Sequence, residues 1–294
     1  MHPLRIIKYP GSKGALLPHI SNAFKESGCS VFVDVFGGSG IVSLNMDAKK
    51  IIYNDLNREL VNIFKSIKAD RQLEIYGKLK ALLSVGQIQQ KDRYGSLVTE
   101  TYSARQYNRT LRERIESMTA NSAVKSRSGE GELAKAFISI CKFSVSFGGL
   151  GNGYATGNEK SPHAYLERTM NTYSEIRRRV STWEIECEDF RKIIEKYDSP
   201  ETFFFLDPPY LSGKWYSDDF VPGDFLELVE MLGNISGTFL LALESKVSGY
   251  DKFNLHKYYK VGITTSTSKR SEPSRTFDLF TNLYKKSDSQ NHQG

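Results

Sequence analysis

The chain has few cysteines, few histidines and no long apolar run, and each shortage argues against a class of protein. Its 294 residues include three cysteines, Cys29, Cys141 and Cys187, which are too few and too far apart for a disulfide framework or a cysteine-cluster zinc site. The five histidines show no pair at metal-ligand spacing, so no metal is expected. No apolar run approaches the roughly 18–20 residues that cross a bilayer. Because a signal-peptide pattern is also missing, we expect a cytoplasmic protein with no membrane partner.

Positive charge is in mild excess and is concentrated in the middle of the chain. The net charge is +6, with a pI near 9.0. Residues 61–180 hold 20 Lys and Arg against 11 Asp and Glu, whereas the remainder holds 20 against 23. This asymmetry is typical of a module that faces a polyanion, set into a near-neutral scaffold. On charge alone, a solvated helical surface explains it equally well.

The first sixty residues contain a strand, a glycine turn, a helix and a second strand. Residues 31–35 are a short apolar run that ends at Phe36-Gly37-Gly38-Ser39-Gly40, and an amphipathic stretch begins near Ile41. The second strand, 50–55, ends on Asp55. This βαβ order predicts a parallel α/β sheet with a right-handed crossover.

The middle of the chain does not continue this alternation of strands and helices, whereas the carboxyl-terminal part does. Residues 61–180 predict helices and loops, namely helices at 61–83, 101–118 and 132–147, a polar loop at 121–132, and a glycine-rich hairpin or loop at 147–157. The later part predicts strands at 183–187, 202–206 and 238–243, helices at 189–197 and 223–233, and a hairpin at 257–267 and 276–284. We therefore expect one α/β sheet domain built from 1–60 and 181–294, with a mainly helical insertion at 61–180.

The glycine turn and the acid that follows it are typical of nucleotide-binding α/β folds. Glycines let the backbone turn tightly and approach a ligand at the carboxyl edge of a sheet. Asp55 stands where a carboxylate can accept both hydroxyls of a ribose; it could also cap the next helix, but the preceding glycine turn favours ribose binding. A glycine-rich turn is also common as a purely structural feature, so neither residue type identifies the ligand.

Asp207-Pro208-Pro209-Tyr210 is more specific, because it follows the continuous apolar run at 202–206. Two prolines in succession restrict the chain and remove hydrogen-bond donors, which a simple strand terminator does not need. Such rigidity would hold two acceptors, the Asp207 carboxylate and the Pro208 carbonyl, beside the ring of Tyr210. An exocyclic amine has two N–H donors and a flat face, so it suits this arrangement as a nucleophile.

This tetrapeptide resembles the catalytic motif of amino-group DNA methyltransferases of the adenine-N6 type, and the chain is most similar to their Dam-like branch. The resemblance implies a Rossmann-like methyltransferase sheet with helices on both faces and S-adenosyl-L-methionine as the cofactor. It also implies that an adenine is flipped out of double-stranded DNA. It assigns catalysis to Asp207, Pro208, Pro209 and Tyr210.

Other motifs of the family occur in the order of this branch. Four segments carry them: the opening motif at 8–13, the cofactor loop at 34–40, the ribose-binding acid motif at 54–57, and the segment at 187–190 whose acid contacts the cofactor's adenine. The resemblance assigns cofactor binding to Tyr9, Lys13, Asp34, Phe36, Gly38, Gly40, Asp55, Asp189, Phe190 and Asp207. Val35 stands where proline is common in the family, and Tyr9 where tryptophan is frequent.

Candidate DNA contacts lie mostly in the basic insertion. Arg105, Arg109 and Arg112 have the i, i+4, i+7 spacing of one helical face. The family's base-reading hairpin corresponds to 143–157, which keeps Asn152 and Tyr154 but lacks the usual Val-Pro. A second group of basic residues, Lys269, Arg270 and Arg275, could clamp the DNA backbone. Phosphate contacts supply most of the affinity for DNA, whereas contacts to base edges set the sequence preference.

Three other functions are weighed against adenine methylation. Cytosine-N4 methyltransferases usually begin the tetrapeptide with serine, so Asp207 favours adenine. A nicotinamide-dependent oxidoreductase would leave the double proline and the basic insertion unexplained. A non-catalytic DNA-binding module would not need the acceptor and aromatic groups. As partners we expect double-stranded DNA and, within a restriction-modification system, a restriction endonuclease; the chain itself is expected to be a monomer or a weak dimer.

Overall fold

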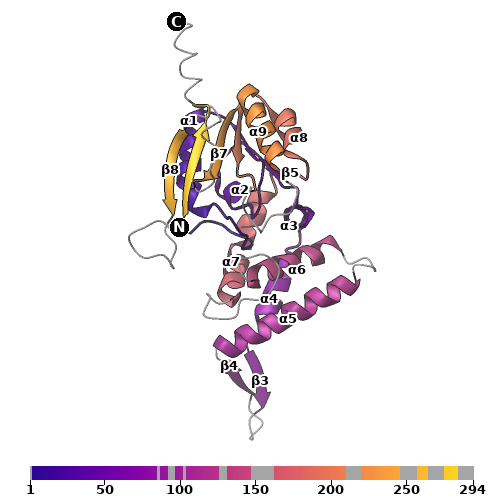
Figure 1. The fold of residues 1–294 in the computed structure, drawn as a ribbon. Coiled ribbons are helices and arrows are strands. Elements are labelled where there is room, and N and C mark those ends of the chain that lie inside the picture. Colours follow the sequence, from indigo (N-terminus) through magenta and orange to yellow (C-terminus); the bar gives the residue numbers. More distant parts are fainter. Residues whose placement is uncertain are drawn as a thin grey trace. The chain divides into compact units, whose positions relative to one another are not determined.

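The computed structural model describes most of the chain and divides it into two compact units (Figure 1). The described ranges are 2–84, 87–91, 97–101, 104–125, 131–146, 162–209, 220–245, 257–263 and 275–283. We call the first unit the helical unit; it comprises Met1–Ser12, Gly38–Leu44 and Asn57–Thr182. We call the second the sheet unit; it comprises Lys13–Gly37, Asn45–Leu56 and Trp183–Gly294.

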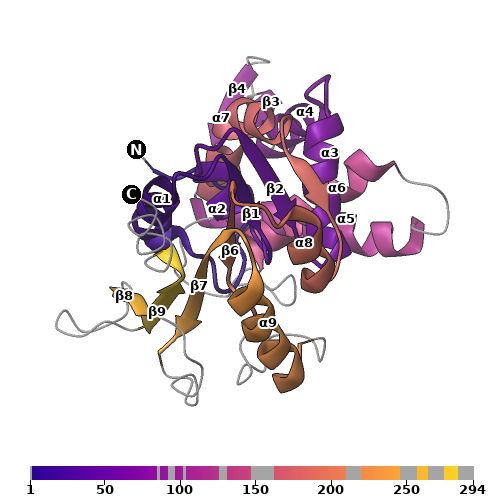
Figure 2. The same ribbon diagram turned by 90° about the horizontal axis from the view of Figure 1, so that it is seen from above.

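The sheet unit contains a seven-stranded sheet in the order β5-β2-β1-β6-β7-β9-β8 (Figure 2). Its strands are β1 (Val31–Asp34), β2 (Lys50–Asn54), β5 (Glu184–Glu186), β6 (Thr202–Leu206), β7 (Thr238–Glu244), β8 (Lys257–Ile263) and β9 (Arg275–Thr281). The first five in this order pair in parallel, while β9 runs antiparallel to both β7 and β8. The chain order reverses between β1 and β6, and in open α/β sheets ligands bind at such a switch point, beyond the carboxyl ends of the strands.

Alternating side chains of the central strands pack against helices on both faces of the sheet. On one face, Phe32 and Phe203 stack at 5.7 Å and meet Phe24 of α1 (Leu17–Ser27). On the other face, Val33 and Phe204 join a core with α8 (Phe190–Tyr197) and α9 (Pro222–Asn234). Consecutive strand residues point to opposite faces, so a strand covered on both sides is buried throughout, as β6 is, and is apolar from Phe203 to Leu206. The predicted α/β sheet with helices on both faces is confirmed.

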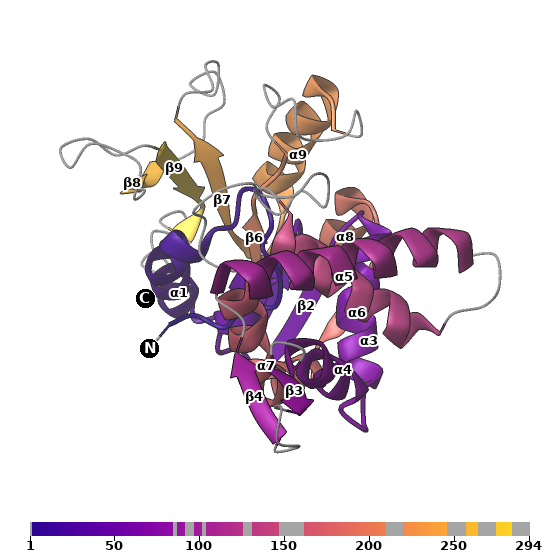
Figure 3. The same ribbon diagram turned by 90° about the horizontal axis from the view of Figure 1, so that it is seen from below.

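The helical unit is a group of α-helices with one two-stranded hairpin (Figure 3). Its elements are α3 (Arg58–Ala69), α4 (Glu74–Leu83), β3 (Gln87–Lys91), β4 (Leu97–Thr101), α5 (Ala104–Lys125), α6 (Glu132–Val145) and α7 (Pro162–Val180). Helix α6 packs against α3, α4, α5 and α7. Between α6 and α3, the carboxylate of Glu59 accepts hydrogen bonds from Ser139 Oγ at 2.7 Å and Lys142 Nζ at 2.6 Å.

The prediction of one helix over 61–83 is wrong, because the chain breaks into two helices after Ala69. Asp70 directly follows α3, and its side chain binds the first backbone N–H groups of α4. Asp70 is buried, and its carboxylate accepts from the backbone N–H groups of Glu74 at 2.7 Å and Ile75 at 3.0 Å. It also accepts from the hydroxyl of Tyr173 at 2.6 Å. The apolar periodicity continues across this break, so the pattern alone does not reveal that a side chain replaces the missing backbone bonds.

Two further predictions for this region are corrected. Strands β3 and β4 were not expected, because Gln87–Lys91 and Leu97–Thr101 are largely polar and lack the alternation of a half-buried strand. Helix α5 continues to Lys125, into the stretch predicted as a loop from 121. The predicted glycine-rich hairpin at 147–157 lies outside the described residues.

Two further observations concern the cysteines and the apolar character of the helices. Cys29, Cys141 and Cys187 are all free thiols, and burial raises the pKa of Cys141 above its usual value. None of the described helices combines the length and the apolar character that crossing a membrane requires.

Candidate active site

Three predicted acids follow neighbouring parallel strands of the sheet unit. Asp34 ends β1, where it is in register with Tyr53 of β2 and Phe205 of β6. Asp55 and Asp207 therefore each come two residues after a residue that is paired with Asp34. Because the strands are parallel, all three acids lie at the same edge of the sheet, beside the switch point. Among the described residues, no group of His, Cys, Asp and Glu is arranged to hold a metal ion.

Lys13 and Asp207 form a buried ion pair at the end of β6. The distance from Lys13 Nζ to Asp207 Oδ2 is 2.6 Å, and the two side chains are 3% and 17% exposed. The ammonium also lies 5.0 Å from the ring centroid of Phe277. A buried ammonium group requires such a partner, since desolvation of an unpaired charge is costly. The pair therefore fixes the orientation of the Asp207 carboxylate.

The remainder of the tetrapeptide is only partly described. Pro208 is buried and Pro209 is half-buried, directly after the fully buried strand β6. The proline rings fix the backbone φ angle, so the Pro208 carbonyl is held rigidly relative to Asp207. Tyr210 lies outside the described residues.

Asn54 ties together three chain segments beside these acids, a role that the sequence analysis did not assign. Its buried side-chain amide donates to the carbonyl of Val35 at 2.9 Å and to that of Glu188 at 3.0 Å. Its Oδ1 accepts from the N–H of Glu188 at 2.9 Å. These bonds fix the ends of β1 and β2 and the turn after β5, and therefore the backbone beside Asp55 and Asp189. An amide as the last residue of a buried strand is the sequence signal that could have revealed it.

The turn after β1 requires glycine at position 37. The Gly37 N–H donates to the carbonyl of Asn54 at 2.7 Å. A Cβ at this position would lie 2.3 Å from Cε2 of Tyr53, whose ring is stacked on Trp183 at 5.8 Å. The glycine at position 37 therefore lets the turn pack closely against β2.

Phe36, Phe190 and Phe220 form an aromatic cluster in the sheet unit. Each pair of ring centroids is 5.9 Å apart. Phe36 follows β1, Phe190 is the first residue of α8, and Phe220 comes just before α9. The cluster brings two predicted cofactor residues together, since the partly buried Phe36 packs against Phe190, which lies in the hydrophobic core. Phe220 is the third member of the cluster.

Asp189 is the N-cap of helix α8, and its carboxylate accepts hydrogen bonds from both the backbone and the side chain of Arg191. Its Oδ1 accepts from the N–H of Arg191 at 2.9 Å, which caps the helix. The Arg191 side chain also reaches this carboxylate, and it extends to Asp224 and Glu227 of α9. Hydrogen bonds to Glu227, Asp224 and Asp189 raise the pKa of Arg191, in that order of influence, and Arg191 lowers the pKa values of Asp224 and Glu227.

Three predicted cofactor residues, Tyr9, Gly38 and Gly40, belong to the helical unit. The ring of Tyr9 meets that of Phe143 edge-on at 6.0 Å. Gly38 and Gly40 have φ angles of +51° and +66°, in the region that favours glycine. A Cβ on Gly40 would lie 2.3 Å from Cζ of Phe64, so this glycine also permits close packing.

Few of the predicted DNA contacts can be placed. Arg109 is 82% exposed and pairs with Glu113 at 3.0 Å. Arg112 is half-buried, and its Nε has no hydrogen-bond partner among the described residues. The predicted common exposed face therefore holds for Arg109 better than for Arg112. The remaining DNA predictions concern side chains outside the described part, namely Arg105, Asn152, Tyr154, Lys269, Arg270 and Arg275.

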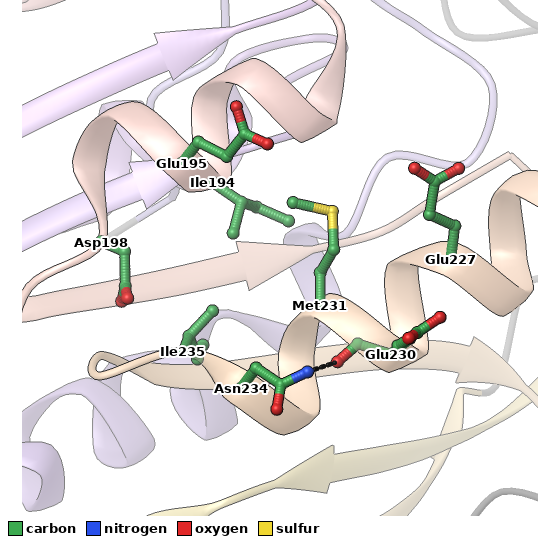
Figure 4. Close-up of a pocket in the computed structure, with 8 residues that line it drawn as sticks. All are labelled: Ile194, Glu195, Asp198, Glu227, Glu230, Met231, Asn234 and Ile235. Carbon is green, nitrogen blue, oxygen red and sulfur yellow. Dashed lines mark hydrogen bonds between the residues drawn. The ribbon is translucent and has the colours of Figure 1, made fainter.

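A hollow of about 520 Å³ lies between α8 and α9 and shares Glu227 with the Arg191 network (Figure 4). It is lined by Ile194, Glu195, Asp198, Glu227, Glu230, Met231, Asn234 and Ile235. Its lining includes no predicted catalytic or cofactor residue. Four carboxylates surround an apolar floor, so the hollow is unsuited to a phosphate group.

Comparison with known proteins agrees with this geometry. Residues 9–221 match the family described as D12 class N6 adenine-specific DNA methyltransferase. The chain is also 25% identical over 222 residues to Type II methyltransferase M.MjaIII of Methanocaldococcus jannaschii, which covers 69% of this chain and 68% of that protein. The family match begins at Tyr9 and extends past the tetrapeptide at 207–210. Because it covers well over half of the sequence, the chain belongs to the D12 class of N6 adenine-specific DNA methyltransferases.

Proposed function

We propose that this adenine-N6 DNA methyltransferase binds S-adenosyl-L-methionine at the carboxyl ends of β1, β2 and β6 and uses Asp207 and Pro208 to orient the target amine. The observation that carries the proposal is the Lys13–Asp207 ion pair, which fixes the carboxylate of the tetrapeptide at the switch point of the sheet.

The residues at this edge of the sheet suit a nucleoside that carries a positive charge. We propose that Asp55 accepts the ribose hydroxyls, and that the partly exposed Phe36, supported by Phe190 in the core, contacts the adenine ring. The carboxylate of Asp34 favours a cation nearby. When bound, the cofactor would supply an electrophilic methyl group on a sulfonium. Tyr9, Gly38 and Gly40 stay predictions from the family resemblance.

Asp207 and Pro208 act on the adenine amine. The amine has two N–H donors, and we propose that one donates to the Asp207 carboxylate and the other to the Pro208 carbonyl. These bonds turn the nitrogen lone pair toward the methyl group. Alignment and fixed dipoles then supply the rate enhancement, with no covalent intermediate on the protein. Tyr210 would stack on the base.

The target adenine must leave the DNA duplex to reach this site. Its N6 amine is paired inside the helix, so base flipping is required, at a cost of a few kcal/mol. We propose residues 61–180 as the target-recognition insertion and residues 1–60 and 181–294 as the catalytic domain. Charge supports this division, because residues 61–180 hold 20 Lys and Arg against 11 Asp and Glu, whereas the remainder holds 20 against 23.

Other properties follow from this function. An enzyme that acts on DNA fits the cytoplasm, where it would associate with the nucleoid, and we expect a monomer or weak dimer. The similarity to a protein named Type II methyltransferase is consistent with a restriction endonuclease partner.

The test measures transfer of tritiated methyl groups from S-adenosyl-L-methionine to unmethylated DNA. We expect Asp207→Ala to abolish transfer, whereas its affinity for DNA in a gel-shift assay stays within about twofold of the wild type, because Asp207 makes no proposed phosphate contact. Lys192→Gln is the matched control, since it removes an exposed ion pair with Glu188 in the sheet unit that involves no residue of the tetrapeptide. Substantial turnover by Asp207→Ala would contradict the mechanism.

A further inference from the structure

Among the described residues of the proposed site, Arg191 contacts the largest number of acidic side chains. We propose that Arg191 is a positioning residue, which orients the adenine end of the cofactor site and ties it to the start of α9. This inference rests on the proposed function, because it takes Asp189 and Phe190 as the residues that meet the cofactor's adenine.

The contacts of Arg191 divide between the predicted cofactor residues and α9. Nη1 lies 3.2 Å from Oδ1 and 3.1 Å from Oδ2 of Asp189. Nη2 lies 2.5 Å from Oδ1 of Asp224 and 2.6 Å from Oε2 of Glu227. The guanidinium carbon also lies 4.3 Å from the ring centroid of Phe190. One side chain thus holds both Asp189 and Phe190 in place.

The α9 end of this network lies where the chain returns from the catalytic tetrapeptide. Asp224 accepts from the N–H of Val221 at 2.7 Å and so caps the first turn of α9. Phe220, directly before it, packs against Phe36 and Phe190. Arg191 and Phe220 therefore both connect the start of α8 with the start of α9. Arg191 does so through ion pairs, and Phe220 through apolar contact.

The geometry requires a guanidinium rather than any cation. The two terminal nitrogens of arginine point in fixed directions, so one can serve Asp189 while the other serves α9, and its flat face can stack on an aromatic ring. The ammonium of lysine is a single point of charge and cannot do all three. If Arg191 is removed, three carboxylates face one another without a cation.

The test measures the dissociation constant of S-adenosylhomocysteine by calorimetry without DNA. We expect Arg191→Gln to raise it about tenfold and Arg191→Lys about threefold, since both lose hydrogen bonds to the Asp189 carboxylate. The control is Lys192→Gln, on the same helix, whose exposed ion pair with Glu188 does not involve Asp189. Its dissociation constant should equal that of the wild type.

Steady-state kinetics separate positioning from general damage. The KM for S-adenosyl-L-methionine should rise in both Arg191 variants, while kcat at saturating cofactor and the KM for DNA stay at wild-type values. If either variant binds S-adenosylhomocysteine as tightly as the wild type, the inference is wrong and the proposed function stands. If Arg191→Gln does not fold, Arg191→Lys decides by the same criterion. Failure of the wild type to bind S-adenosylhomocysteine would instead refute the proposed function.

Discussion

The side chains of Lys13 and Asp207 show how one contact can serve both stability and chemistry. The lysine is almost fully buried, so it cannot fall back on water when its partner is removed. The same pair holds the carboxylate that we propose to orient the adenine amine. Separate substitutions can distinguish the two effects.

We expect Lys13→Met to lower the free energy of unfolding by about 2–3 kcal/mol, because it leaves Asp207 without its cation. This cost is smaller than that for a fully buried ion pair, since the Asp207 side chain is 17% exposed. Urea denaturation of Lys13→Met, Asp207→Asn and the double variant measures the coupling. Strictly additive effects would show that the two residues do not interact. Methyl transfer by Lys13→Met should also fall, since the carboxylate is no longer held.

Residues differ in how well the sequence reveals them. Asp207 and its prolines were predictable, because they follow an apolar run and their types suit an amine. Asn54 and Arg191 were not, because each acts on segments more than thirty residues away along the chain. Local sequence does not show which distant carbonyl or carboxylate a side chain will meet.

At the scale of helices and strands, the buried network around Asp70 organises the helical unit. Asp70 accepts from two backbone N–H groups of α4 and from Tyr173 of α7, while Arg177 donates to its backbone carbonyl at 2.6 Å. Burial, followed by the hydrogen bond to Asp70, raises the pKa of Tyr173. One residue thus joins α3, α4 and α7.

We expect Asp70→Ala to cost about 3 kcal/mol of unfolding free energy, since three donors lose their acceptor. Tyr173→Phe should cost about 1 kcal/mol, because the two backbone bonds of Asp70 remain. Asn57→Ala, which removes the exposed N-cap of α3 in the same unit, is the reference at about 1 kcal/mol. Thermal or urea unfolding checks the order; an Asp70→Ala effect no larger than that of Asn57→Ala would contradict it.

The strands of the sheet were easier to predict than the elements of the helical unit. Strands β1, β6 and β7 each contain a continuous apolar run because helices cover both faces, so these strands are visible in composition. By contrast, the hairpin β3–β4 is mostly polar, and the break at Asp70 depends on a side-chain cap. Hydrophobic patterns in a sequence reveal buried apolar side chains. Neither the polar hairpin nor the helix break at Asp70 is marked by such side chains.

For the whole molecule, charge is divided between the two units. The net charge of the helical unit is +11 and that of the sheet unit is −5. The overall value of +6 conceals this contrast. A basic unit suits DNA, whereas an acidic unit suits a cofactor that carries a sulfonium charge.

The charge division predicts where salt sensitivity resides. Replacing Arg105, Arg109 and Arg112 together by alanine should weaken DNA binding and reduce the slope of log K against log salt by about 3, since each phosphate that is no longer neutralised lowers the slope by roughly 1. Fluorescence anisotropy at several salt concentrations measures the slope. Lys192→Gln, in the sheet unit, should leave the slope unchanged. An unchanged slope in the triple variant would place the DNA-binding face elsewhere.

The central claim is that this chain methylates N6 of adenine through the tetrapeptide that begins at Asp207. The most direct test is methylome sequencing of DNA from cells that express either the wild type or Asp207→Ala. We predict N6-methyladenine in a defined sequence context with the wild type, and none above background with the variant. No methylated adenine with the wild type, methylation of cytosine instead, or equal methylation with both proteins would contradict the account.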